Sequence, residues 1–174
     1  FSGASVTLGD ETTGTGPVAD VFASAVGMNN TKETGTLTIY GGTYTTHNTY
    51  QTDGVVGAEK FNSLLYLSAT GVTNIYGGTF RSKNPTESAH LISLPYQNVE
   101  HVVNIFGGSF ESNGEVFYLG EEKGGSGNGA PKVSITGGTF SDNVAEFHER
   151  SLCAQDYTTT QLPNGSYLVR PEKN

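Results

Sequence analysis

The segment Leu37-Thr-Ile-Tyr-Gly-Gly-Thr-Tyr44 decides the fold, because close copies of it recur along the chain. The copies are Thr73-Asn-Ile-Tyr-Gly-Gly-Thr-Phe80, Val103-Asn-Ile-Phe-Gly-Gly-Ser-Phe110 and Val133-Ser-Ile-Thr-Gly-Gly-Thr-Phe140. Their Gly-Gly pairs begin at residues 41, 77, 107 and 137, which gives spacings of 36, 30 and 30 residues. Ser5-Val-Thr-Leu-Gly-Asp10 is a degenerate earlier copy. A period of about thirty residues is the signature of a fold that stacks one repeated unit several times.

Within each copy the residues alternate with a period of two, which predicts a β-strand. We expect Ile39 and its counterparts to point into the core, together with the aromatic residues that follow each Gly-Gly pair. The pair itself is expected to form a corner, where glycine adopts a positive φ without a Cβ clash. A second strand per unit is predicted at residues 64–67, 91–94 and 116–119, with an N-terminal counterpart at residues 21–25.

Stacking of these units in register predicts a right-handed parallel β-helix, an all-β solenoid of about five rungs over residues 1–143. Parallel strands about 4.8 Å apart would place isoleucine over isoleucine and ring over ring. A β-propeller is less suited, since its blades usually run to about 40 residues or more. Residues 144–174 are predicted to be a linker and hairpin cap of the same domain, with a turn at Asn164-Gly165 and a turn or two of helix in residues 144–153. The predicted loops are residues 46–62, 83–89, 95–101 and 120–131.

Composition and charge narrow the range of partners. Apolar residues make up 34% and aromatic residues 10%, with 24 glycines, which favours an ordered all-β chain with a narrow core over disorder. The net charge is -8 and no run of Lys or Arg occurs, so we expect no nucleic-acid partner and no anionic membrane surface. No apolar stretch is long enough for membrane insertion. The single Cys153 excludes an internal disulfide, and we expect no metal and no cofactor.

The Ile-x-Gly-Gly-Thr-Phe units, such as Ile75-Tyr-Gly-Gly-Thr-Phe80, resemble repeats in large cell-surface proteins of Gram-positive bacteria. The end of the chain is similar to theirs too, because Thr139-Phe140 is followed by a short linker and by Asn164-Gly-Ser-Tyr-Leu-Val169. The resemblance covers most of the chain from about residue 33 onward and implies a pectate-lyase-like parallel β-helix in a secreted or cell-surface setting. That class contains adhesins and sugar-cleaving enzymes, so the resemblance implies no particular activity. The abrupt start at Phe1, without a signal peptide, indicates a piece excised from a larger secreted protein.

The register that sends the isoleucines inward sends the residue before each Gly-Gly pair outward. These residues form one column: Tyr40, Tyr76, Phe106 and Thr136. Beside them runs a polar ladder: Thr38, Asn74, Asn104 and Ser134. Rings flanked by amides and hydroxyls suit the flat faces and hydroxyl groups of sugars, so the candidate ligand-binding residues are Tyr40, Tyr76, Phe106, Asn74 and Asn104. The alternative is that the rings only satisfy β-propensity or lie beneath a loop such as residues 46–62.

No catalytic residue is predicted. Arg81 and Glu111 face outward on adjacent repeats and are expected to form an ion pair, while no two acids share an outward column. The histidines show no metal-ligand spacing and are expected at the surface: His47, His90, His101 and His148. The predicted function is therefore an adhesin or stalk module outside the cell, with a glycan or a host surface protein as its ligand. The alternative is a carbohydrate-active enzyme, either a polysaccharide lyase or a glycoside hydrolase.

Overall fold

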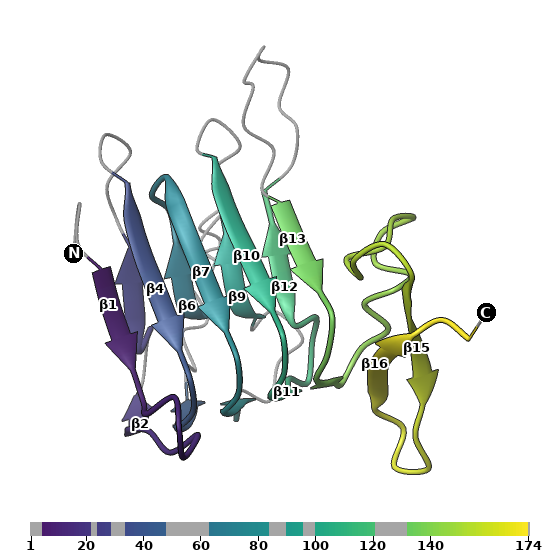
Figure 1. The fold of residues 1–174 in the computed structure, drawn as a ribbon, viewed down its shortest axis with the longest axis horizontal. Coiled ribbons are helices and arrows are strands. Elements are labelled where there is room, and N and C mark those ends of the chain that lie inside the picture. Colours follow the sequence, from purple (N-terminus) through teal and green to yellow (C-terminus); the bar gives the residue numbers. More distant parts are fainter. Residues whose placement is uncertain are drawn as a thin grey trace, which may run out of the picture.

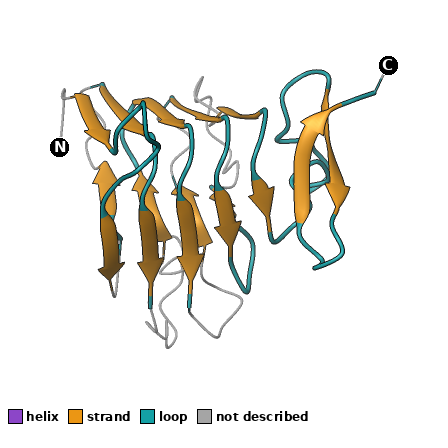
Figure 2. Cartoon of the chain, turned by 60° about the horizontal axis from the view of Figure 1, so that its bottom comes forward, coloured by secondary structure: helices purple, strands orange, loops and turns teal. Residues whose placement is uncertain are grey.

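The computed structural model describes residues 5–21, 24–28, 34–47, 63–83, 90–95, 100–120 and 132–173, and these residues form strands and turns but no helix. The strands belong to three sheets (Figure 1, Figure 2). The first sheet contains β1 (Ser5–Leu8), β4 (Gly35–Ile39), β7 (Gly71–Ile75), β10 (His101–Ile105) and β13 (Lys132–Ile135). The second contains β2 (Val18–Val21), β5 (Thr43–Thr46), β8 (Thr79–Ser82), β11 (Ser109–Glu111), β14 (Thr139–Phe140), β16 (Tyr167–Pro171) and β15 (Tyr157–Gln161). The third contains β3 (Val26–Met28), β6 (Ser63–Leu67), β9 (His90–Leu94) and β12 (Phe117–Leu119).

From β1 to β14, strands that follow one another along the chain lie in different sheets. After β4 of the first sheet come β5 of the second and β6 of the third, and β7 then returns to the first sheet beside β4. Strands one repeat apart pair in parallel, so that Ile75 lies between Ile39 and Ile105. The predicted stacking of equivalent residues is therefore confirmed. The first four repeats each supply three strands where the sequence predicted two, because the residues after the Gly-Gly corner form a sheet of their own, and the last repeat supplies β13 and β14.

The side chains that point between the sheets form one hydrophobic core, as the alternation predicted. The stacked isoleucines are fully buried, and so are the aromatic residues after each corner. These aromatic rings are Tyr44, Phe80, Phe110 and Phe140, with successive centroids 5.1, 4.8 and 4.7 Å apart. The spacing is that of hydrogen-bonded strands, and each ring pair adds about 0.5–1.5 kcal/mol beyond the burial of its area. The hydroxyl of Tyr44 donates to the carbonyl of Gly41 at 2.9 Å, and burial raises the pKa of Tyr44 to about 12.

The two glycines of each corner are needed for different reasons. The second glycine has a positive φ, 113° at Gly78, and a Cβ there would lie 3.2 Å from the carbonyl oxygen of Gly42 and 3.3 Å from the Phe80 ring. The first glycine instead lies close to the preceding repeat. A Cβ on Gly107 would lie 2.7 Å from the carbonyl oxygen of Tyr76, which is shorter than real Cβ contacts. Gly-Gly therefore combines a left-handed turn with close backbone packing between repeats.

The degenerate N-terminal copy pairs with the first clear one. Within β1 and β4, Leu8 lies beside Ile39, as the sequence comparison of the two copies predicted. Residues 9–16 then form an insertion before β2, which pairs with β5. The third-sheet strand of this repeat is β3, in which Val26 lies beside Leu65. The strand predicted at residues 21–25 is therefore wrong, because the insertion shifts the strand positions toward the C-terminus.

Residues 144–153 form turns and isolated bridges, so the predicted turn or two of helix is wrong. His148 and Glu149 adopt left-handed φ values of 45° and 65°, which an α-helix does not accommodate. The backbone of this segment bonds to the first sheet instead. The N–H of Ile135 donates to the carbonyl of Leu152 at 3.1 Å, and the N–H of Ala154 donates to the carbonyl of Ile135 at 2.9 Å.

Side chains of the same segment pack on the C-terminal end of the core. Val144, Phe147 and Leu152 are buried there, and the Phe147 ring meets Phe117 edge-on with centroids 6.3 Å apart. The predicted hairpin follows as β15 and β16, with its turn at Asn164-Gly165. Strand β16 pairs antiparallel with β14 and so extends the second sheet.

The predicted loops fall mostly on residues 48–62, 84–89, 96–99 and 121–131, which lie outside the described residues. Two residues assigned to these loops belong to strands instead, because Thr46 ends β5 and His101 begins β10. Across the described ranges, no helix has the length and apolar character needed to cross a bilayer.

Replacing Gly78 by alanine is expected to lower the free energy of unfolding by about 1–3 kcal/mol, because alanine is strained at this positive φ. Urea unfolding followed by circular dichroism would measure the change. Gly27→Ala is the matched control, since a Cβ there meets no atom within 4 Å, and it should be neutral or stabilising by up to about 1 kcal/mol. Equal stability of the two variants would contradict this account of the corner.

Candidate ligand-binding face

The outer face of the first sheet carries the predicted aromatic column. Tyr40, Tyr76 and Phe106 directly follow β4, β7 and β10, and each directly precedes a Gly-Gly corner. Tyr40 and Tyr76 stack with centroids 5.0 Å apart and planes 19° apart, and Tyr76 and Phe106 stack at 4.7 Å and 14°. Tyr76 is 47% exposed and Phe106 45%, whereas Tyr40 is half-buried. Two of the three predicted rings therefore contact solvent.

The two ends of the column differ. At the N-terminal end, the hydroxyl of Tyr40 lies beside the carboxylate of Glu11 in the inserted residues 9–16. Burial, together with this carboxylate, raises the pKa of Tyr40. The insertion is held by Asp10, whose Oδ1 accepts from the N–H of Thr12 at 3.0 Å and of Thr13 at 2.8 Å. A turn rich in internal hydrogen bonds therefore closes this end of the column.

At the other end, Thr136 takes the place of a fourth ring. The N–H of Phe106 donates to the carbonyl of Ile75 at 2.8 Å, and the N–H of Thr136 donates to the carbonyl of Ile105 at the same distance. Thr136 is therefore the next member of the column, but its side chain is much shorter than a ring. Its hydroxyl lies 3.4 Å from the carbonyl oxygen of Ile105, so it turns back to the backbone.

Stacking limits which ring surfaces a ligand reaches. Tyr76 has one ring against each of its faces, so its edge and hydroxyl are what solvent contacts. Among the described residues, Phe106 has a ring stacked on one face, that of Tyr76, and on its other side the next position of the column belongs to Thr136. The sequence predicted a column of stacked rings suited to the flat faces of sugars; within the described residues, no ring stacks on the second face of Phe106.

The polar ladder lies beside the rings on the same face. Asn104 pairs in register with Asn74 on one side and with Ser134 on the other. The Nδ2 of Asn104 donates to the Oδ1 of Asn74 at 2.9 Å. Within the described residues, the Oδ1 of Asn104 and the hydroxyl of Ser134 have no hydrogen-bond partner. The structure thus brings all five candidate residues together and leaves an acceptor and a hydroxyl available beside the rings.

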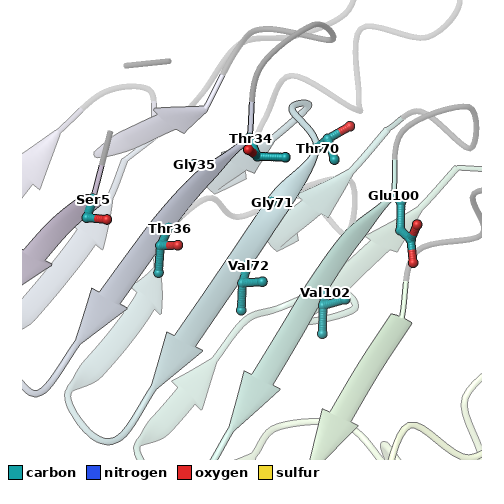
Figure 3. Close-up of a pocket in the computed structure, with 9 residues that line it drawn as sticks. All are labelled: Ser5, Thr34, Gly35, Thr36, Thr70, Gly71, Val72, Glu100 and Val102. Carbon is teal, nitrogen blue, oxygen red and sulfur yellow. The ribbon is translucent and has the colours of Figure 1, made fainter. Parts of the chain in front are cut away.

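A shallow groove of about 320 Å³ crosses the same face where the strands begin (Figure 3). Side chains of Thr36, Val72 and Val102 form its floor, from β4, β7 and β10. Glu100 lies at its rim and accepts a hydrogen bond from the Nζ of Lys132 at 3.2 Å. This groove was not predicted from the sequence, although Val72 and Val102 have the same outward register as Asn74 and Asn104 and indicate an apolar patch there. The outer face therefore runs from an apolar groove across a polar ladder to an aromatic column.

The other candidate sites have structural roles. The predicted ion pair is confirmed, since the Nε of Arg81 lies 2.8 Å from Oε2 of Glu111, but both side chains are half-exposed and the pair contributes less than about 1 kcal/mol. In the described part of the chain, no three His, Cys, Asp or Glu side chains gather closely enough to hold a metal ion. Cys153 is a free, half-buried thiol, and burial raises its pKa.

Two of the histidines are not at the surface, which corrects the sequence-based expectation. His101 is 1% exposed and His90 is 8% exposed, whereas His47 and His148 lie nearer the surface beside Asp20 and Glu115. The Nδ1 of His101 lies 2.6 Å from the carbonyl oxygen of Ala69, and its Nε2 lies 2.9 Å from Oγ1 of Thr73. Gly71 is the register partner of His101 and has no side chain to occupy this space. Burial lowers the pKa of His101, which the hydrogen bond to Ala69 partly offsets.

Comparisons with known proteins identify no relative of this chain, because no family model, no curated protein and no solved structure matches it.

The buried His101 is expected to make stability depend on pH. Its pKa is lowered in the folded state, so below the ordinary value of 6.5 the unfolded chain binds more protons than the folded one. Stability should therefore be intact above pH 6.5 and fall as the pH drops below it, with a slope of up to about 1.4 kcal/mol per pH unit. Urea midpoints measured between pH 8 and pH 5 would test this. His101→Gln should be less stable than wild type at pH 8 and should lack this part of the pH dependence. An unchanged slope in the variant would show that groups other than His101 cause the pH dependence.

Proposed function

We propose that this chain is a right-handed parallel β-helix and that it serves as a glycan-binding adhesin module of an extracellular or cell-surface protein. Three parallel ladders support the β-helix, because each takes one strand from successive repeats in chain order. The resemblance of the Gly-Gly-Thr-Phe units to bacterial surface-protein repeats supports the extracellular setting. The proposal concerns binding, since no observation among the described residues favours a catalytic centre.

The observation that carries the proposal is the exposure of two stacked rings on a polar face. Tyr76 and Phe106 leave nearly half of their surface open to solvent although neighbouring rings cover them on one or both faces. Exposed aromatic side chains next to amide and hydroxyl groups are what sugar-binding surfaces use, because a sugar has apolar C–H faces and a rim of hydroxyls. The ladder of Asn74 and Asn104 supplies the polar part within one or two residues of the rings.

The charge of the outer face favours a neutral glycan. The outward residues of the first sheet are Ser5, Thr7, Thr36, Thr38, Val72, Asn74, Val102, Asn104, Lys132 and Ser134. Lys132 is the one charged member of this set, and Glu100 pairs with it. The net charge of the chain is -8, so an acidic polysaccharide would be repelled. Four residues along a strand span about 13 Å, so the face is long enough to hold a short oligosaccharide from the groove to the rings.

A glycan array tests the proposal. Wild type is expected to bind neutral glycans, and Tyr76→Ala and Phe106→Ala should each weaken binding at least about tenfold, because aromatic side chains supply a large share of such contacts. Val18→Ala is the matched control: Val18 is 81% exposed but lies in the second sheet, so the variant should bind like wild type.

Circular dichroism of each variant would show that a loss of binding is not a loss of folding. Full binding by both folded ring variants would remove the column as the site. If wild type bound a host surface protein and no glycan, the proposed glycan ligand would be wrong and the protein would take its place in the proposal.

A further inference from the structure

We infer that one pyranose ring of the glycan stacks on the open face of Phe106 and takes the place of the missing fourth ring of the column. The inference rests on the proposed glycan binding and adds to it the position, number and chemical class of the bound sugar. It comes from the difference between the two ends of the stack.

The position follows from the spacing of the column. Successive rings are 5.0 and 4.7 Å apart, and the backbone bond that positions Phe106 over Ile75 is repeated at 2.8 Å by Thr136 over Ile105. A fourth ring would therefore stand over Thr136, at the distance at which flat groups stack. The threonine side chain ends after its Cγ and Oγ atoms, and the outer part of that place holds no atom of Thr136.

The next residue along the column is small as well. The N–H of Ala154 donates to the carbonyl of Ile135 at 2.9 Å, so Ala154 follows Thr136 in the same series of backbone contacts. Two small side chains, Thr136 and Ala154, therefore adjoin the open face of Phe106. A six-membered ring on Phe106 meets no large side chain of the column on its far side.

The polar neighbours select the class of sugar. Asn104 lies two residues before Phe106 on the same outward face, about 6–7 Å along the strand. Its Nδ2 is held by Asn74, so its Oδ1 accepts from the ligand, and Ser134 beside it offers a hydroxyl. A pyranose with equatorial hydroxyls places C–H groups against the ring and its hydroxyls toward Asn104 and Ser134. The site therefore fits a neutral pyranose with one unbroken C–H face.

The rest of the column supports binding of a single sugar ring. Among the described residues, Tyr76 has a ring on each face, and Tyr40 is half-buried beside Glu11. Tyr40 and Tyr76 are therefore positioning residues that hold Phe106 at the end of a rigid stack. Phe106 is the residue that contacts the sugar face.

The chain contains no tryptophan, so a single introduced indole reports on one place without background. Phe106→Trp keeps a flat ring at the end of the stack, and Val18→Trp, the matched control, puts the same reporter at an exposed position of the second sheet, outside the column. The probes are neutral pentasaccharides of β-linked glucose, galactose, mannose or N-acetylglucosamine. With the pentasaccharide that wild type binds, the emission of the Phe106→Trp variant should shift with a saturating dependence on concentration, and that of the Val18→Trp variant should not.

The outcomes separate the two proposals. If wild type binds a pentasaccharide but the indole at position 106 is unaffected, or both indoles respond equally, the stacking position is wrong and glycan binding stands. If wild type binds none of the probes, both proposals fail. Phe106→Trp should bind the pentasaccharide with the affinity of wild type, and Phe106→Ala should bind it at least about tenfold more weakly. This pair of results would support the stacking position, because it would show that binding requires a flat ring at position 106.

Discussion

In the first sheet, the backbone hydrogen bonds that place Ile75 between Ile39 and Ile105 also determine where every outward side chain lies. Parallel pairing in register puts equivalent residues of successive repeats about one strand spacing apart, so any residue type that recurs becomes a stack or a ladder. The same constraint produces the buried aromatic stack, the exposed aromatic column and the hydrogen bond between Asn74 and Asn104. A shift of one residue in one repeat would exchange core and surface for that strand and would break all of these features together.

The features that recur with the repeat could be predicted from the sequence. The period located the isoleucines, the aromatic core and the Gly-Gly corners, and alternation then assigned Tyr40, Tyr76 and Phe106 to the outside. The ion pair between Arg81 and Glu111 could be predicted in the same way, because the two residues occupy equivalent outward positions in adjacent repeats. These predictions succeed because each rests on strands that pair in register and along which inward and outward positions alternate.

Features that depend on departures from the repeat could not be located in this way. The insertion at residues 9–16 moved β3 away from its predicted position. Residues 144–153 form turns that pack against the end of the core, in place of the predicted turn or two of helix. The burial of His101 was within reach, since it has the same parity as Ile105, but residue-type averages place histidine at the surface. That no ring among the described residues stacks on the second face of Phe106 depends on Thr136 breaking the column, and this becomes evident only once the rings are seen to stack.

The direction of the hydrogen bonds between strands has a mechanical consequence. The strands lie across the long axis of the molecule and the two chain ends lie at its opposite extremes (Figure 1), so the bonds between repeats point along that axis. A tensile load applied through the termini therefore pulls these bonds apart in line instead of shearing a whole ladder at once. We expect such a body to yield at its weakest junction and to lengthen one repeat after another, which dissipates a sudden force in small steps while the remaining repeats keep their shape.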